Sequence, residues 1–153
     1  MATANGQHSP SSASPLSIHG QYVKDFSFEN PNPLAVFGAE NQDKQPQIAI
    51  DIQVKAEPIA EKAYEIVLSV RADAKRDEQQ LFLTELSYAG LVSLGDVPQE
   101  HVGPLLMIHC PTLFFPFVRQ LIAEATRNGG YPPLMLEPVD FSHLYEEQQK
   151  AEK

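Results

Sequence analysis

The sequence predicts an α+β fold: a four-stranded antiparallel sheet followed by two C-terminal helices on one face, the first long and kinked. Residues 16–94 contain four stretches with the two-residue alternation of strands. After Gly95 the apolar residues change to the three- and four-residue spacing of a helix. Strands that come first and helices that come last are typical of a sheet covered on one face. The 153 residues suffice for one compact domain.

The first strand is expected from Leu16 to the prolines at positions 31 and 33, and Gly20 is a candidate bulge. Its apolar residues share one parity, which predicts that they share one face of the sheet: Leu16, Ile18, Tyr22, Phe26 and Phe28.

The next three strands follow from the same alternation. Isoleucines and a valine alternate with polar residues between positions 48 and 54, which predicts the second strand, and a third is expected from Tyr64 to Lys75. The polar run 76–79 predicts a hairpin turn into the fourth strand, residues 81–94. That strand carries apolar residues on both faces, as a central strand does.

Two helices are expected after the strands. Pro104 and Pro111 are predicted to interrupt the beginning of the first helix, and an amphipathic stripe runs through residues 114–125. Pro116 lies inside this stripe and predicts a kink, and Gly129-Gly130 ends the helix. A proline-rich link, residues 131–138, then leads to a short final helix.

The final helix has a recognisable start, because Asp140 is suited to the N-cap and Val139 with Leu144 to a hydrophobic staple. We expect one folded domain at residues 16–148. A disordered N-terminal tail is expected at residues 1–15, which are rich in Ser, Ala, Asn and Pro, and a flexible C-terminal tail at residues 149–153.

Charge and patterning limit the classes of partner. Acidic residues outnumber basic ones 20 to 11, for a net charge of -9, which argues against binding to nucleic acid or to anionic membranes. The N-terminus has neither the cationic nor the apolar region of a secretory signal. The longest apolar window, residues 103–118, contains prolines and falls short of a membrane span. We therefore expect a cytoplasmic protein.

The sequence gives little support for catalysis. His109 and Cys110 are neighbours, and neighbouring side chains on a helix point about 100° apart, so they do not form a nucleophile–base pair. Cys110 is expected to be an inert buried thiol. The five histidines lack metal-ligand spacing, and no glycine-rich phosphate loop opens a helix. We expect no enzymatic activity, no metal and no cofactor.

The odd-numbered positions of the strands would form the outer face of the sheet if the helices cover the even-numbered side. These positions include six acidic residues, interrupted by Leu83 and a few other apolar residues: Asp25, Glu29, Asp51, Glu65, Asp73 and Glu85. Two interpretations stay open, a solvated face and a docking surface for a basic partner with Leu83 as its apolar anchor.

Two helices are a thin cover for four strands, so exposed apolar surface is expected, as in an oligomer interface or a binding groove. Apolar residues in irregular segments and on the last helix are the candidates for a groove, although such residues more often belong to the core: Leu34, Val36, Phe37, Tyr131, Leu134, Phe141 and Leu144.

Several stretches closely resemble the SecB family of bacterial protein-export chaperones. They are YVKDFSFENPN (22–32), AYEIVLSV (63–70), LFLTEL (81–86) and CPTLFFPFVRQLIAEATRNGGYPPLMLEPVDF (110–141) with the LY that follows. The similarity covers residues 16 to 148. The N-terminal tail is longer than is usual in the family, and the loop 34–46 matches poorly.

The resemblance implies an ATP-independent chaperone that binds unfolded preproteins in apolar grooves and delivers them to the SecA translocase ATPase. An alternative is a SecB-like adaptor for a narrow client, such as a toxin-control partner. It also implies a homotetramer, a dimer of dimers with helices between the sheets, in which we expect Phe114, Phe117 and Leu121 at the interface. The implied contact with SecA comprises Asp25, Glu29, Leu83 and Glu85.

Overall fold

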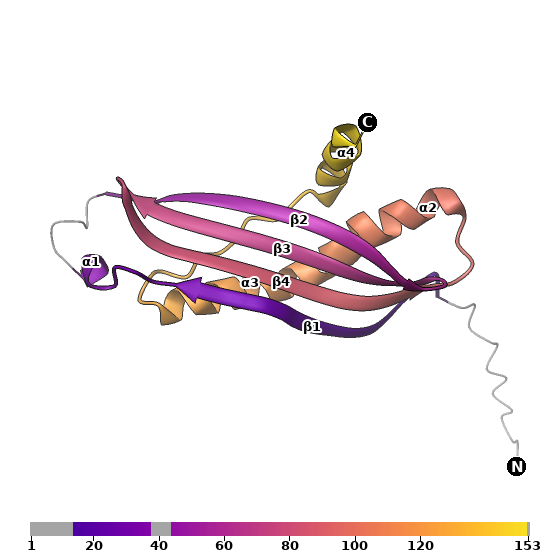
Figure 1. Cartoon of the computed structure of the whole chain (residues 1–153), viewed down its shortest axis with the longest axis horizontal. Helices are drawn as coiled ribbons and strands as arrows, with labels where there is room; N and C mark the ends of the chain where they lie inside the picture. The colour runs from indigo at the N-terminus through magenta and orange to yellow at the C-terminus, as the bar shows by residue number, and fades with distance from the viewer. Residues whose placement is uncertain (1–13, 38–43, 153) are drawn as a thin grey trace, which may run out of the picture.

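The computed structural model describes residues 14–37 and 44–152 and consists of a sheet with helices on one side (Figure 1). The strands are β1 (Leu16–Glu29), β2 (Gln47–Ala60), β3 (Ala63–Arg76) and β4 (Gln79–Leu94). The helices are α1 (Leu34–Phe37), α2 (Gln99–Pro104), the π-helical segment η2 (Leu105–His109), α3 (Cys110–Asn128) and α4 (Phe141–Ala151). The tail predicted to be disordered lies, except for residues 14 and 15, outside the described residues.

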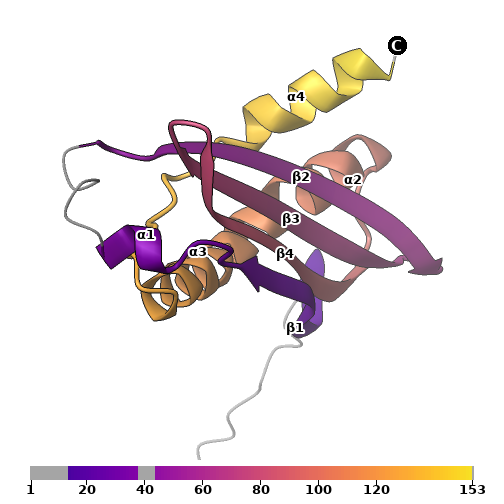
Figure 2. The same cartoon turned by 60° about the vertical axis from the view of Figure 1, so that its left-hand side comes forward.

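The predicted fold class is confirmed. The four strands are antiparallel and lie in the order β1-β4-β3-β2, so β4 and β3 are central and β1 and β2 form the edges. Figure 2 shows α2 and α3 lying across one face of the sheet, while α4 projects away from it. We call the face opposite α3 the outer face.

The edge strand β1 departs from the predicted alternation, because it contains two register shifts, between Ile18 and Gly20 and between Val23 and Asp25. Each shift inverts which face the following side chains occupy. Tyr22, opposite Ala89, therefore lies on the outer face and not with Phe26 on the helix face as predicted. The second shift cancels the first, so the positions after it return to the predicted faces.

The prolines do not break the first long helix. The chain is continuously helical from Gln99 to Asn128, and its irregular part is η2, where the Cys110 N–H donates to the Leu105 carbonyl. This wide turn precedes Pro111, which has no N–H to donate and whose ring would crowd a regular α-helical turn. Pro116 stays inside α3, so the irregularity lies upstream of the predicted kink.

Within the described residues, this continuous 30-residue helix is the one segment long and apolar enough to cross a membrane by length and composition. It is longer than the sequence window suggested, because the prolines are accommodated. Its apolar side packs on the sheet: Phe114, Val118 and Ile122 are fully buried. The helix is thus a core element of this fold.

The main core lies between α3 and the two central strands. Phe114 packs edge-to-face on Tyr88, with ring centroids 5.9 Å apart, and it occupies the space above Gly90 of β4. A second, smaller cluster lies at the end of the sheet near α1 and comprises Ala72, Ala74, Leu81, Phe82 and Tyr131.

The helix termini agree with the sequence. Gly129 follows α3, and the Asp140 carboxylate accepts a hydrogen bond from the His143 N–H at 3.2 Å, as an N-cap does. Helix α4 continues to Ala151, so residues 149–151, predicted to be a flexible tail, are helical.

The contact between Gly90 and Phe114 generates a stability prediction. A Cβ added at Gly90 would overlap the Phe114 ring, so Gly90→Ala should lower the free energy of unfolding by about 1–3 kcal/mol. Gly20→Ala in β1 is the matched control, because a Cβ there meets nothing within 4 Å, and it should change stability by no more than about 0.5 kcal/mol. Urea denaturation measures both, and equal effects would contradict the packing described.

Candidate functional site

The four residues expected to contact a translocase ATPase lie together on the outer face. Glu29 pairs with Leu83 in the register, and Asp25 with Ser87, two positions along β4 from Glu85. Leu83 is half-buried between Glu29 on β1 and Asp73 on β3. That Asp25, Glu29, Leu83 and Glu85 share one face is thus confirmed, while their role in binding stays a prediction.

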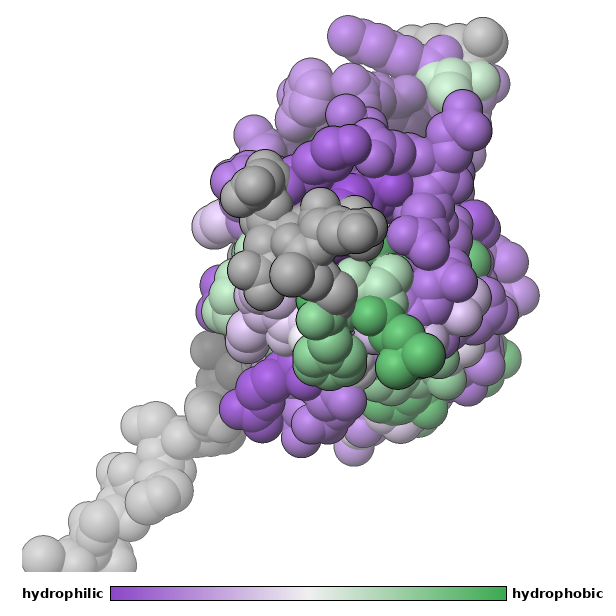
Figure 3. All heavy atoms as spheres, turned by 90° about the vertical axis from the view of Figure 1, so that its left-hand side faces the viewer, coloured by the Kyte–Doolittle hydropathy of each residue, from purple (hydrophilic) through white to green (hydrophobic). Residues whose placement is uncertain are grey.

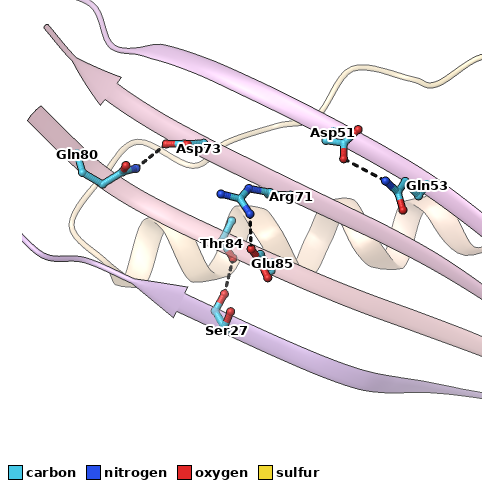
Figure 4. A network of polar contacts seen from close by, with 8 residues as sticks. All are labelled: Ser27, Asp51, Gln53, Arg71, Asp73, Gln80, Thr84 and Glu85. Carbon is cyan, nitrogen blue, oxygen red and sulfur yellow. Dashed lines mark hydrogen bonds and ion pairs between the residues drawn. The ribbon is translucent and has the colours of Figure 1, made fainter. Parts of the chain in front are cut away.

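Some of the outer-face acids have partners (Figure 4). Arg71 Nη1 lies 2.8 Å from Glu85 Oε1, with both side chains about half exposed, and Gln80 Nε2 donates to Asp73 Oδ1 at 2.6 Å. Among residues 14–37 and 44–152, neither Asp25 nor Glu29 forms an ion pair. Exposed pairs contribute little to stability, so these carboxylates remain available to a cationic partner.

A second polar cluster on the outer face contains Tyr22, Lys24 and Glu65. Lys24 Nζ lies 2.6 Å from Glu65 Oε1, and the Tyr22 hydroxyl donates to the other carboxylate oxygen. The hydrogen bond from Lys24 and then that from Tyr22 lower the pKa of Glu65, and the carboxylate in turn raises the pKa of Lys24. The three groups therefore link the edge strand β1 to the central strand β3.

The outer face is hollowed beside Asp25. Ser69 and Ser87 lie at neighbouring positions of the central strands, with their hydroxyl oxygens 3.2 Å apart, and Asp51 and Arg71 line the same hollow of about 230 Å³. A hollow with small polar residues and several carboxylates suits an inserted basic side chain better than an apolar one.

On the opposite side of the sheet, an apolar groove runs between the edge strand β2 and the link that follows α3. The groove has a volume of about 360 Å³, and Ile48, Ile50 and Met135 in its wall are 38%, 41% and 62% exposed. Its lining is almost entirely apolar: Ile48, Ile50, Ile52, Leu134, Met135, Leu136 and Glu137. Of the residues predicted for a groove, it contains Leu134.

Sequence reasoning missed the isoleucines of this groove. It placed them on the inner side of the second strand, which is correct, but alternation does not show that β2 is an edge strand beyond the reach of α3. The available signal was the excess of apolar strand residues over the helical surface that could cover them.

Three predicted groove residues lie on α1, at one end of the sheet. Leu34 and Phe37 are 84% and 72% exposed, and Val36 packs on the smaller core cluster beside Leu134. The Phe37 ring lies next to Gly130, which follows α3. Figure 3 shows hydrophobic surface gathered at this end of the molecule. Leu134 thus connects the α1 surface with the β2 groove.

The remaining three predicted groove residues do not line the β2 groove. Tyr131 is buried in the smaller core cluster, and its hydroxyl lies 2.7 Å from Asn30 Oδ1 and 2.9 Å from the Leu81 carbonyl oxygen. Phe141 is also buried and packs edge-to-face on Phe115 at 6.1 Å. Leu144 is half-buried against the main core. Helix α4 is thus anchored by these side chains.

The three residues of α3 expected at a subunit interface differ in how far they are exposed. Phe114 is fully buried between α3 and the sheet, so it belongs to the core and is not available to a second subunit. Phe117 is 47% exposed and stacks on Tyr88 at 6.1 Å, and Leu121 is half-buried. Val23 on the edge strand β1 lies opposite Tyr88 of β4, is 45% exposed and extends this apolar surface.

Cys110 is not a reactive thiol in this fold. It is fully buried, and burial raises its pKa to about 12, so the thiolate is scarcely populated near neutral pH. Among residues 14–37 and 44–152, no group of three or more His, Cys, Asp or Glu side chains could hold a metal ion.

Comparison with known proteins agrees with this geometry. The family model described as "Preprotein translocase subunit SecB" matches residues 9–152. The protein-export protein SecB of Mesorhizobium japonicum is 45% identical over 96% of this chain and 87% of its own length. Those of Sinorhizobium medicae and Rhodospirillum centenum are 46% and 48% identical over 99% and 94% of this chain, and 90% and 84% of theirs.

Among solved structures, a SecB-like chaperone of Mycobacterium tuberculosis, in complex with a ChAD peptide from the HigA1 antitoxin, has a similar fold. Its TM-score is 0.65 at 13% identity, and the match covers 82% of this chain and 91% of that one. At this identity the likeness concerns the fold alone.

Proposed function

The chain belongs to the SecB family of protein-export chaperones, which are not enzymes, and from this premise we propose how its surfaces divide the work. The β2 groove and the α1 surface hold unfolded preproteins, and the outer face delivers them to the SecA translocase ATPase in the cytoplasm. The observation that supports this proposal most is that the apolar groove and the acidic face lie on opposite sides of the same sheet.

The groove is suited to clients of unrelated sequence. Apolar contact needs no specific side-chain geometry, and burying one client Leu or Phe contributes about 1.5–3 kcal/mol before the entropy losses of binding. Ile50 and Met135 in the groove and Leu34 on α1 offer several such contacts at separate points. Binding the unfolded state lowers the concentration of aggregating client by mass action, so the holding step requires neither ATP nor a cofactor.

We propose a homotetramer, a dimer of dimers, as the working form. Exposed Phe117 and half-buried Leu121 on α3, with Val23 and Phe26 on the edge strand β1, provide an apolar surface for a second copy. Linking several grooves in one assembly raises the affinity for a long client beyond that of a single groove.

A dedicated adaptor for one client is the second candidate function. It is suggested by the peptide of an antitoxin in the Mycobacterium tuberculosis structure. That protein is 13% identical, whereas the relatives at 45–48% are export proteins, so we favour export. A pulldown that recovers one folded partner and no translocase ATPase would favour the adaptor.

We expect the chain to suppress the aggregation of an unfolding client, followed by light scattering at stoichiometric tetramer. Ile50→Asn should weaken binding of an unfolded client about tenfold, because one apolar contact is lost. Ala49→Asn is the matched control, since it introduces the same side chain at the neighbouring, outward-facing position. Undiminished aggregation with the unmodified chain would refute the holding function.

Sedimentation should give an assembly of about 68 kDa, four times the 17.0 kDa chain. Phe117→Asp should shift it to smaller species, because a buried interface would then contain an unpaired charge. Phe37→Asp, an equally drastic change at another exposed phenylalanine, should preserve the size. A monomer from the unmodified chain would contradict the tetramer.

Delivery to the translocase ATPase should depend on the acids of the outer face. Asp25→Lys and Glu85→Lys should each weaken binding of purified SecA by about tenfold, an effect that increases at low salt. Glu78→Lys, in the turn between β3 and β4, makes the same charge change elsewhere and should have little effect. A parallel loss of client holding would mean that the two surfaces are misassigned.

A further inference from the structure

The edge strand β1 is held in the sheet from one side only, by pairing with β4. Its two register shifts leave the segment between Ile18 and Asp25 inverted relative to the rest of the strand. A slip of one residue at the second shift would move Asp25 and Glu29 from the outer face to the helix face. The acidic face therefore depends on something that keeps this shift in place.

The Tyr22–Lys24–Glu65 cluster lies at that shift. Lys24 has no partner in the register with β4, and its ammonium group reaches Glu65 on β3, the strand beyond β4. The intervening strand offers Ala89 opposite Tyr22, a small, fully buried residue over which longer side chains can pass. The contact thus spans two strands.

Glu65 is a firm anchor for the edge strand. It lies within β3, paired on one side with Glu57 of β2 and on the other with Leu91 of β4, and its side chain is 15% exposed. Lys24 is 47% exposed, so the more exposed partner is the one on the edge strand. The pKa shifts of Lys24 and Glu65 have opposite signs, as expected when each stabilises the charged form of the other.

We propose that Lys24 and Glu65 are positioning residues of the partner surface: their ion pair fixes the register shift at Val23/Asp25 and so holds Asp25 and Glu29 beside Leu83 and Glu85. The proposal rests on the proposed function of the outer face. It assigns a specific role to a lysine on a surface whose partner is expected to be basic.

The positioning role and simple attraction by charge predict opposite effects for one substitution. Lys24→Glu makes the outer face more acidic, so a partner attracted by charge alone should bind more tightly. If Lys24 positions the acids, the new carboxylate repels Glu65, the shift is released, and affinity for purified SecA should fall by roughly three- to tenfold. Lys55→Glu is the matched control, because Lys55 is an exposed lysine on β2 that lines the same outer-face hollow as Lys24 and Asp25. Among residues 14–37 and 44–152 it forms no ion pair, so this substitution makes the same charge change without disturbing the contact with Glu65. Its affinity should be unchanged or higher.

Exchanging the two charges of the ion pair tests the positioning role directly. Lys24→Glu combined with Glu65→Lys has the net charge of the unmodified chain and should recover its affinity to within about twofold. Hydrogen exchange of the β1 amides should be faster in Lys24→Glu alone, while client holding in the β2 groove is retained. If Lys24→Glu does not fold, Glu65→Gln provides the milder variant, with Glu57→Gln as its control at the register-paired position.

The outcomes distinguish a failure of the proposed partner from a failure of the proposed positioning role. If the unmodified chain does not bind SecA, the proposed partner is refuted. If it binds and Lys24→Glu behaves like Lys55→Glu, or the double variant fails to recover, the positioning role is overturned.

Discussion

The helix from Gln99 to Asn128 packs mainly on the two central strands and covers the edge strands β1 and β2 only in part. A strand covered by a helix buries its apolar face, as Leu68 and Leu86 do, whereas Ile48 and Ile50 at the β2 edge stay about 40% exposed. The same limited cover by the helix leaves Phe26 and Val23 exposed at the β1 edge. The β2 groove, which we propose for clients, and the apolar surface that we propose for a second copy are both consequences of this narrow cover.

The alternation of strand side chains separates the two proposed binding activities. In β4, Leu86 and Tyr88 point toward α3, whereas Leu83 and Glu85, at odd-numbered positions before them, point outward. In the proposed assignment, an apolar client and a basic partner would meet opposite faces of one sheet and would not compete for the same side chains. A chaperone that must hand over its client can in this way be bound by the receiving protein while the client is still in place.

The sequence predicted most of the fold, because the alternation in residues 48–54 and 64–75 and the helical spacing after Phe114 are strong local signals. It placed Asp25 and Glu29 on the correct face although β1 contains two bulges, because the second restores the parity that the first inverts. Tyr22, between the bulges, was consequently misplaced. Local patterns could not show that three prolines fit one helix through a π-helical turn.

The candidate site was less predictable, since exposure depends on strand order. Phe114 and Phe117 belong to the same amphipathic stripe, yet one is fully buried and the other is half exposed, depending on how α3 is rotated over the sheet. Tyr131 and Phe141 are aromatic, as a groove wall would be, but in the structure they are buried and attach the link and α4 to the rest of the fold. Ile48 and Ile50 became groove residues only because β2 lies at an edge.

The strand order also has a kinetic consequence. Strands β2, β3 and β4 form a meander of consecutive hairpins, whereas β1 pairs with β4 across the whole meander, as in the contact between Thr84 and Ser27, 57 residues apart. Contacts of such high sequence separation are slow to form, because a long loop must close before they stabilise the chain. Asp25 and Glu29 reach Leu83 and Glu85 only through this last, non-local pairing. The docking surface that we propose is therefore complete only once β1 has paired with β4, so a partner that binds this surface would select chains that have finished folding.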